Sequence, residues 1–277
     1  MFRRLRVLAA LLSAVITLPL LVGGPVSEAG AKERCDDLAD FGRTNFPNPT
    51  RIDNPFFSLV PGTQYTLQGQ SNVSGQPLPH TVTFTVTDLI KRIGDTQTIV
   101  VHDIDVSNGT PIEAELAFFA QDDRKNVWAL GEFPLELPDR VAPSTWIHGL
   151  RGAKAGVLVP GSPSVSPDFF LQAFAPAHVI FDCGRVIQVD SDALVIDEFS
   201  PDDPAAHQLK YYRRGLGLDR IAPLNDPQGE TLVTVSRSRL NRHQLAEIRE
   251  RTLELERIAY GISDVYRQTP PMQQGPS

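Results

Sequence analysis

The chain has little of what marks a nucleic-acid-binding protein, because positive charge is scarce. Among 277 residues, 26 lysines and arginines face 33 aspartates and glutamates, which gives a formal net charge of −7. Binding to a phosphate backbone relies on an excess of lysine and arginine on one face. Nucleic acid is therefore not an expected partner.

Signature motifs of the common enzyme classes are also missing. The sequence contains no GxSxG, Walker A, GxGxxG or HExxH pattern, so it lacks the marks of serine hydrolases, nucleotide-binding enzymes and zinc proteases. The acidic stretch Asp122–Asn126 lacks the later glutamate of a calcium loop and is interpreted as a hairpin turn. Six histidines lie without metal-ligand spacing: His80, His102, His148, His178, His207 and His243. We therefore expect no metal site and no cofactor.

Long hydrophobic runs are absent except at the N-terminus. Three arginines within the first six residues precede the apolar run Val7–Val22, and a small-residue sequence ends at Ala31. This order predicts a signal peptide over residues 1–31 with cleavage near Ala31, and hence a secreted or extracytoplasmic protein. A retained membrane anchor is the alternative, but a spanning helix needs about 20 apolar residues. We expect no stable transmembrane span after processing.

Cysteine is scarce, and both cysteines, Cys35 and Cys183, follow the predicted signal peptide. An exported chain meets an oxidising compartment, where an even pair of cysteines tends to be bridged. The sequence predicts a Cys35–Cys183 disulfide, which would stabilise the fold by about 5 kcal/mol in the chain-entropy model. The alternative is that two thiols so far apart in sequence never meet.

Turn-forming residues are plentiful, with 23 prolines and 20 glycines spread along the chain. They separate alternating or apolar runs that are typical of strands. The predicted strands cover residues 64–68, 81–87, 96–106, 111–121, 126–132, 177–182, 185–189, 193–199, 207–213 and 230–235. We therefore predict a mainly β fold, with one antiparallel meander sheet over 32–239 curled into an open or half barrel.

The sharpest local signal is Asn108-Gly109, which favours a type I′ turn between two long strands. Pairing Ser107 with Thr110 fixes a register in which the partner numbers sum to 217, so that His102 faces Glu115. Together with Asp103, Asp105 and Glu113, these two residues form the densest predicted cluster of titratable groups. A polar sheet face of this kind could line a partly wet cavity or could simply be solvated.

The chain changes character at Leu240. Apolar residues at three- and four-residue steps, from Leu245 to Tyr266, predict an amphipathic helix over 240–267 that packs on the β domain. The alternative is a helix that binds a partner protein. Residues 268–277 contain three prolines, and we expect a disordered tail.

Several segments in a fixed order resemble a family of exported bacterial β-rich proteins of unknown function. They are Arg51–Phe57 (RIDNPFF) running into Leu59–Thr63 (LVPGT), Ala120–Asp122 (AQD) with Asn126–Trp128 (NVW), Gly131-Glu132, Trp146 and Gly149 with Gly152–Lys154 (GAK) and Gly156, and Lys210–Tyr212 (KYY) with Gly215–Leu218 (GLGL). The resemblance spans residues 41–221 and implies one secreted β-rich domain. It carries no activity and no catalytic residues. The chain departs from the family pattern at Ala129-Leu130, where an aromatic residue usually stands, and in its C-terminal helix.

Three functions are compatible with these features. The first is an exported, non-enzymatic carrier whose concave sheet face binds an apolar or amphipathic small molecule. The second is a structural or interaction component of the cell envelope, and the third is an exported hydrolase that uses carboxylates and His102. The oligomeric state is left open. The predicted ligand-binding residues are Phe118, Phe119, Trp128, Trp146, Tyr211, His102 and Glu115.

Overall fold

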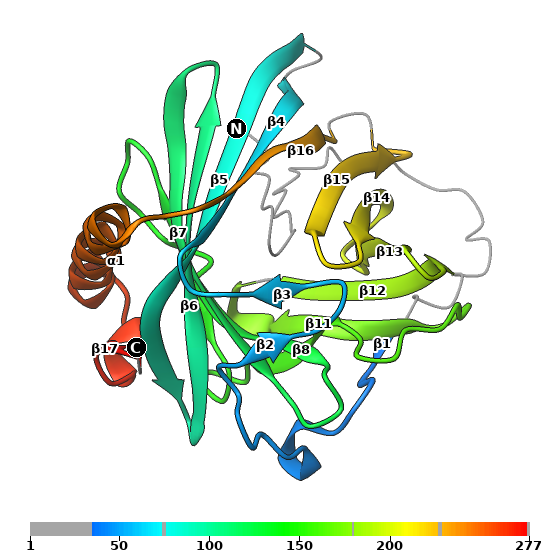
Figure 1. Cartoon of the computed structure of the whole chain (residues 1–277), viewed down its shortest axis with the longest axis horizontal. Helices are drawn as coiled ribbons and strands as arrows, with labels where there is room; N and C mark the ends of the chain where they lie inside the picture. Colours follow the sequence, from blue (N-terminus) through cyan, green and yellow to red (C-terminus); the bar gives the residue numbers. More distant parts are fainter. Residues whose placement is uncertain (1–34, 74–75, 179, 227–228, 276–277) are drawn as a thin grey trace, which may run out of the picture.

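A long antiparallel sheet closes on itself in the computed structural model, which describes residues 35–73, 76–178, 180–226 and 229–275 (Figure 1). The predicted signal peptide over 1–31 lies outside the described residues. Twelve strands form the ring. In spatial order they are β11 (Phe169–Ala175), β10 (Lys154–Val159), β8 (Val127–Glu136), β7 (Thr110–Gln121), β6 (Thr96–Ser107), β5 (Gln76–Ile93), β4 (Thr63–Val73), β16 (Thr231–Arg239), β15 (Gly217–Leu224), β14 (Asp203–Arg213), β13 (Ala193–Ser200) and β12 (Ile180–Val189).

The mainly β fold is confirmed, but the prediction of an open or half barrel is wrong. Strand β11 pairs with β10 on one side and with β12 on the other, and this second pairing joins the two ends of the sheet. Strands β10, β11 and β15 lie outside the predicted runs, so the sequence did not identify the element that closes the ring. Closure satisfies the backbone groups that an open edge would expose.

The predicted Asn-Gly turn is confirmed. Asn108 and Gly109 have φ angles of 48° and 78°, and Ser107 pairs with Thr110 as expected. A bulge between Asp105 and Val106 then shifts the register by one residue. Beyond the bulge every partner differs from the prediction.

The barrel wall separates two hydrophobic clusters because successive side chains of a strand point to opposite faces. The inner cluster includes Tyr65, Phe84, Val101 and Phe119. The outer cluster includes Phe118, Trp128 and Phe133.

Two short strands close one end of the barrel from inside. Strand β2 (Ile52–Asp53) pairs with β3 (Ser58–Leu59), and the loop between them carries Phe56 and Phe57 into the inner cluster. The side chain of Asn54, fully buried, donates to the carbonyls of Lys125 and Pro160 at 2.8 and 3.1 Å and accepts from the backbone N–H groups of Phe56 and Phe57. We call this segment, residues 52–59, the plug.

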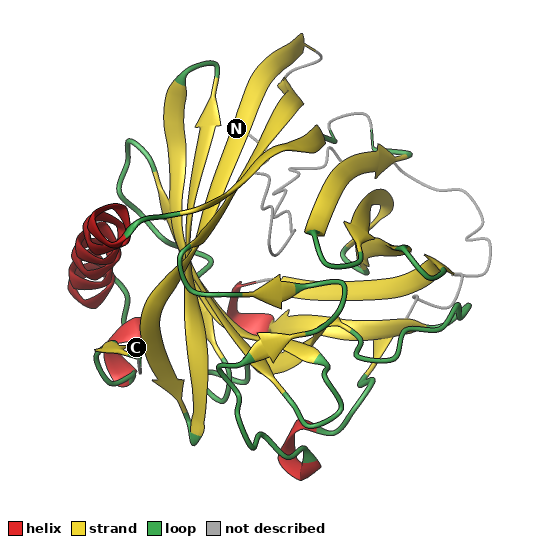
Figure 2. Ribbon diagram, in the orientation of Figure 1, coloured by secondary structure: helices red, strands yellow, loops and turns green. Residues whose placement is uncertain are grey.

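A helix covers the outer face of β5 and β7 (Figure 2). Helix α1 (Arg242–Ile262) begins at a capping box in which Asn241 and Gln244 each bond the other's backbone N–H. Thr252, Leu255 and Ala259 are buried, in agreement with the predicted apolar stripe.

Residues after the helix also pack on the barrel, unlike the disordered tail that the sequence suggested. A 3-10 turn, η3 (Tyr266–Gln268), leads to β17 (Gln273–Gln274), which pairs with β5. The buried Glu256 carboxylate accepts from the backbone N–H of Met272 and lies 2.7 Å from the Lys91 ammonium. Met272 is also buried among the outer cluster. The hydrogen bond, the strand pairing and this burial together hold the proline-rich segment on the barrel.

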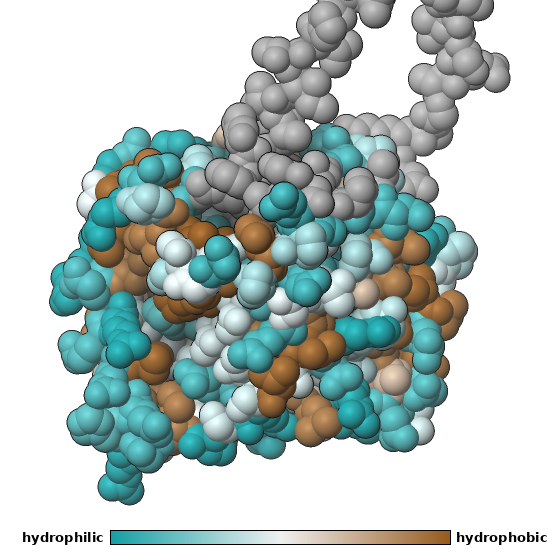
Figure 3. Space-filling view, turned by 90° about the horizontal axis from the view of Figure 1, so that it is seen from above, coloured by the Kyte–Doolittle hydropathy of each residue, from teal (hydrophilic) through white to brown (hydrophobic). Residues whose placement is uncertain are grey.

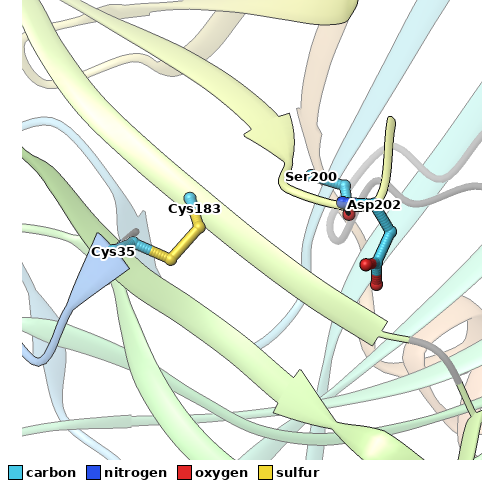
Figure 4. Close-up of a disulfide and its surroundings, with 4 residues drawn as sticks. All are labelled: Cys35, Cys183, Ser200 and Asp202. Carbon is cyan, nitrogen blue, oxygen red and sulfur yellow. Dashed lines mark hydrogen bonds between the residues drawn. A yellow bond between two sulfur atoms is a disulfide. The ribbon is translucent and has the colours of Figure 1, made fainter. Parts of the chain in front are cut away.

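The predicted disulfide is confirmed. Strand β1 (Cys35–Asp36) runs parallel to β11, and Cys35 is bonded to Cys183 of β12 with Cα atoms 5.8 Å apart (Figure 4). At the β13–β14 turn, the Ser200 hydroxyl accepts from the backbone N–H of Asp202. The disulfide closes a sequence separation of 148 residues and ties β1 to the barrel wall.

The face seen in Figure 3 mixes hydrophilic residues with scattered hydrophobic patches. Exposed apolar residues on β15 and β16 and beside them are aliphatic: Leu216, Leu224, Val233 and Val235. None of the helices in the described ranges combines the length and the apolar character that crossing a bilayer requires.

Candidate functional site

Ionisable side chains line the inner wall of the barrel at the end opposite the plug. We call this region the carboxylate end, and its members lie near the Asn108-Gly109 turn and the start of β16. Each is at most 6% exposed. They are His80 of β5, Asp103 and Asp105 of β6, Glu113 and Glu115 of β7, Glu132 of β8 and Glu230, which precedes β16.

Strand register places these groups on the inner face. Asp103 pairs with Phe84 and Glu115, and Asp105 pairs with Val82 and Glu113. Phe84 and Val82 belong to the inner cluster, and their cross-strand partners point to the same side.

His80 of β5 lies close to two acidic side chains, one on β6 and one just before β16. Its Nε2 atom lies 3.3 Å from Oε2 of Glu230 and 3.7 Å from Oδ2 of Asp105. Neither ring nitrogen makes a hydrogen bond of acceptable geometry. Burial lowers the pKa of His80 to about 4, so the imidazole is neutral near pH 7.

The pKa values of the surrounding carboxyl groups are shifted in the opposite direction, upward. Burial, followed by the charges of Glu113 and Glu230, raises the pKa of Asp103 well above its usual range. Burial and the neighbouring Asp103 raise the pKa of Asp105 well above its usual range. Burial raises the pKa of Glu230 to about 8, although Lys210 and a hydrogen bond from Gln208 act against it. Near neutral pH these acids therefore tend to hold their protons.

A second polar group lies on the inner wall at β11, β13 and β14. The Lys210 ammonium of β14 is 2.7 Å from Oε2 of Glu198 on β13, and Gln172 of β11 donates to the other oxygen of Glu198 at 2.9 Å. Lys210 and Glu198 are both buried. The positive charge of Lys210 is thus already neutralised by its own partner.

Trp146 adds a donor to this wall. Strand β9 (Trp146–Ile147) pairs with β8, and Trp146, fully buried, belongs to the inner cluster. Its indole N–H has no hydrogen-bond acceptor. Buried polar atoms in folded proteins are nearly always paired, so these unpaired atoms distinguish the inner wall from an ordinary core.

The seven predicted ligand-binding residues do not form one site. Phe119, Trp146 and Glu115 face the barrel interior. Phe118 and Trp128 belong to the outer cluster, where the Phe118 ring is 6.1 Å from Tyr266.

His102 and Tyr211 also lie outside the barrel. His102 pairs with Leu116 of the outer cluster, and burial lowers its pKa to about 4. The predicted pairing of His102 with Glu115 is therefore wrong, and the bulge between Asp105 and Val106 is the physical reason. Tyr211 stacks beneath the Arg220 guanidinium at 3.7 Å on the outer wall.

Sequence reasoning missed His80, Glu132, Lys210 and Glu230. A signal was present for His80, because it shares the alternation of the apolar Val82 and Phe84 and therefore their face. No comparable signal identified the others, since their strands had no predicted register.

A separate pocket of about 760 Å³ lies outside the wall at the plug end. It is bordered by residues after Cys35 and by the loop before β11, including Asp36, Asp168 and Phe169. Its volume suits a small molecule. The orphaned buried groups described above are not among its lining residues, so the barrel interior is the stronger site.

Within the described ranges, no group of three or more histidine, cysteine or acidic side chains is arranged to hold a metal ion.

No protein-family model matches the chain, and no curated protein matches it. Two solved structures align with it at 10% sequence identity. One, from Bacteroides fragilis, is described as an exported protein with a YmcC-like fold; 66% of this chain and 99% of that chain align, with a TM-score of 0.32. The other, from Parabacteroides distasonis, is described as a lipoprotein; 67% of this chain and all of that chain align, with a TM-score of 0.28.

Proposed function

We propose that the protein is an exported, non-enzymatic carrier that holds a small amphipathic molecule inside its barrel. One observation carries this proposal: buried polar atoms without partners, on His80, Asp103 and Trp146, lie on the same inner wall as a large apolar cluster. An amphipathic guest would complement both kinds of surface.

Barrel size supports the proposal. A barrel of about eight strands is just filled by its own side chains or holds one small ligand, and the interior widens as strands are added. Twelve strands enclose a wider space, and the plug occupies one end of it.

Export is supported by the disulfide and by the sequence pattern of residues 1–31. Disulfides persist in oxidising compartments, and Cys35–Cys183 is the cysteine pair of this chain.

The two alternative functions have weaker support. A hydrolase built on His102 and Glu115 would need these side chains together, whereas they point to opposite faces of β6 and β7. An envelope component that docks through aromatic residues would need them exposed, whereas the strongly exposed large hydrophobic residues in the described ranges are aliphatic.

Native mass spectrometry of the full chain, expressed with its own leader and purified without detergent, tests the carrier function. We expect an added mass that is retained under gentle activation and lost when the protein is unfolded. A consistently ligand-free protein that also fails to take up added amphiphiles would contradict the proposal.

A further inference from the structure

We propose that the guest is cationic, and that Asp103, Asp105 and Glu230 hold its positively charged nitrogen. This inference rests on the proposed carrier function and adds the chemical class of the ligand.

The first step concerns the acceptors. One carboxylate oxygen on each of the three residues, Oδ1 of Asp103, Oδ2 of Asp105 and Oε2 of Glu230, is buried without a hydrogen-bond donor. The Asp105 and Glu230 oxygens lie within 3.7 Å of the same His80 nitrogen, so they share one locality. An alkylammonium group offers three N–H donors in a compact head, which matches such a set of acceptors.

The second step concerns charge. Within the described part of the chain, Asp103, Asp105 and Glu230 form no ion pair with lysine or arginine. Lys210 is paired with Glu198, and His80 is neutral near pH 7 because burial lowers its pKa to about 4. Lys210 therefore acts on Glu230 only from a distance, while Asp103 and Asp105 have no lysine or arginine partner in the described ranges. A cationic guest would allow them to ionise while buried, since buried charges are tolerated when paired.

The third step concerns the donor on the same wall. The fully buried Trp146 indole N–H has no acceptor and is independent of the acidic residues. Its aromatic ring belongs to the inner apolar cluster with Phe119, which forms the apolar part of the same wall. A charged nitrogen at the carboxylate end and an apolar body against this cluster would together fill both surfaces.

Calorimetric titration of the full-length protein near neutral pH with decylamine, decanol and decanoate tests the inference, because these probes differ only in the head group. We expect decylamine to bind at least about tenfold more tightly than decanol. Decanoate should bind more weakly than either.

Two double variants distinguish amine binding by the interior acids from attraction of the amine to the acidic surface. Asp103→Asn with Asp105→Asn should reduce the decylamine preference to within about twofold of decanol, while decanol binding is unchanged. The control, Asp95→Asn with Glu250→Gln, replaces two carboxyl groups at exposed positions and should leave the full preference.

Each outcome has a distinct meaning. Equal binding of decylamine and decanol by the unmodified protein would overturn the cationic inference and leave the carrier function standing. An unchanged amine preference in the interior variant would also overturn it, because surface charge would then explain the preference. Binding of none of the three probes would contradict the carrier function itself.

Discussion

At the plug end of the barrel, the Phe57 ring packs edge-on against Phe119 and Tyr212, with centroids 6.1 and 5.9 Å away. The buried Asn54 side chain makes four hydrogen bonds to backbone groups there. At the carboxylate end, the same inner wall carries one unpaired oxygen on each of Asp103, Asp105 and Glu230 and the unpaired ring nitrogens of His80. At the plug end the named buried polar groups are hydrogen-bonded, as in a stable core, whereas at the carboxylate end several buried polar atoms are unpaired. From this difference we propose that the plug end supports the fold and that the carboxylate end serves binding.

The largest expected effect is at the plug. Phe57→Ala should lower the free energy of unfolding by about 3–5 kcal/mol, because it leaves a cavity among buried aromatic rings. Urea denaturation of the oxidised protein measures this. As the control, Val60→Ala at a 42% exposed site beside the plug should change it by less than about 0.5 kcal/mol. A loss below 1 kcal/mol for Phe57→Ala would show that the plug does not support the fold.

The next effect is a dependence of stability on pH that arises at the carboxylate end. The folded state keeps a proton on Glu230 up to about pH 8, whereas an unfolded glutamate releases it near pH 4.5. The folded state thus binds more protons in this window, and stability should fall as pH rises. Between pH 6.5 and 8, we expect a loss of about 1–2 kcal/mol from this residue.

Denaturation curves across this window, with Glu230→Gln as the comparison, measure the contribution of Glu230 together with its effect on the pKa values of Asp103 and Asp105. His80 titrates below the window, because its folded pKa is about 4 and its ordinary value is 6.5. Lys91, whose pKa burial lowers to about 8, contributes mainly above it. A slope that is unchanged in Glu230→Gln would assign the pH dependence to other groups.

A smaller effect, an increase in the free energy of unfolding, is expected from Asp103→Asn. This substitution removes a buried acid with an orphaned oxygen, so at about pH 8 it should raise the free energy of unfolding by about 1 kcal/mol, in contrast to the loss at the plug. The same denaturation assay measures it. A marked loss of stability would mean that Asp103 supports the fold, and the contrast between the two ends would fail.

The smallest effect concerns the outer wall. His102→Gln should change decylamine binding by less than about twofold, because the His102 side chain lies outside the barrel. Glu115→Gln, one strand away on the inner face, should weaken the same binding measurably. Equal effects of the two substitutions would contradict the assignment of inside and outside.

Much of the wall could be predicted from local patterns. Alternation identified most strands from residue 64 to residue 121. The Asn108-Gly109 turn could be predicted because its two central residues adopt positive φ angles, which Asn and Gly favour. The pairing of Cys35 with Cys183 followed from compartment and cysteine count.

Closure of the barrel and assembly of the site could not be predicted in this way. The β11–β12 pairing and the bulge after Asp105 depend on long-range packing, and a shift of one residue exchanges the two faces of a strand. For this reason, the register predicted from the turn pairs Glu115 with His102, whereas in the structure Glu115 pairs with Asp103.

The two tryptophans of the chain provide the most direct test of the central claim, because Trp146 faces the interior and Trp128 faces the outer cluster. A decylamine analogue brominated along its tail quenches only indole rings that it contacts. In Trp128→Phe, the fluorescence of Trp146 should be quenched at saturation, whereas Trp128 should keep its fluorescence in Trp146→Phe. Quenching of Trp128, or of neither ring despite measured binding, would contradict a ligand held inside the barrel.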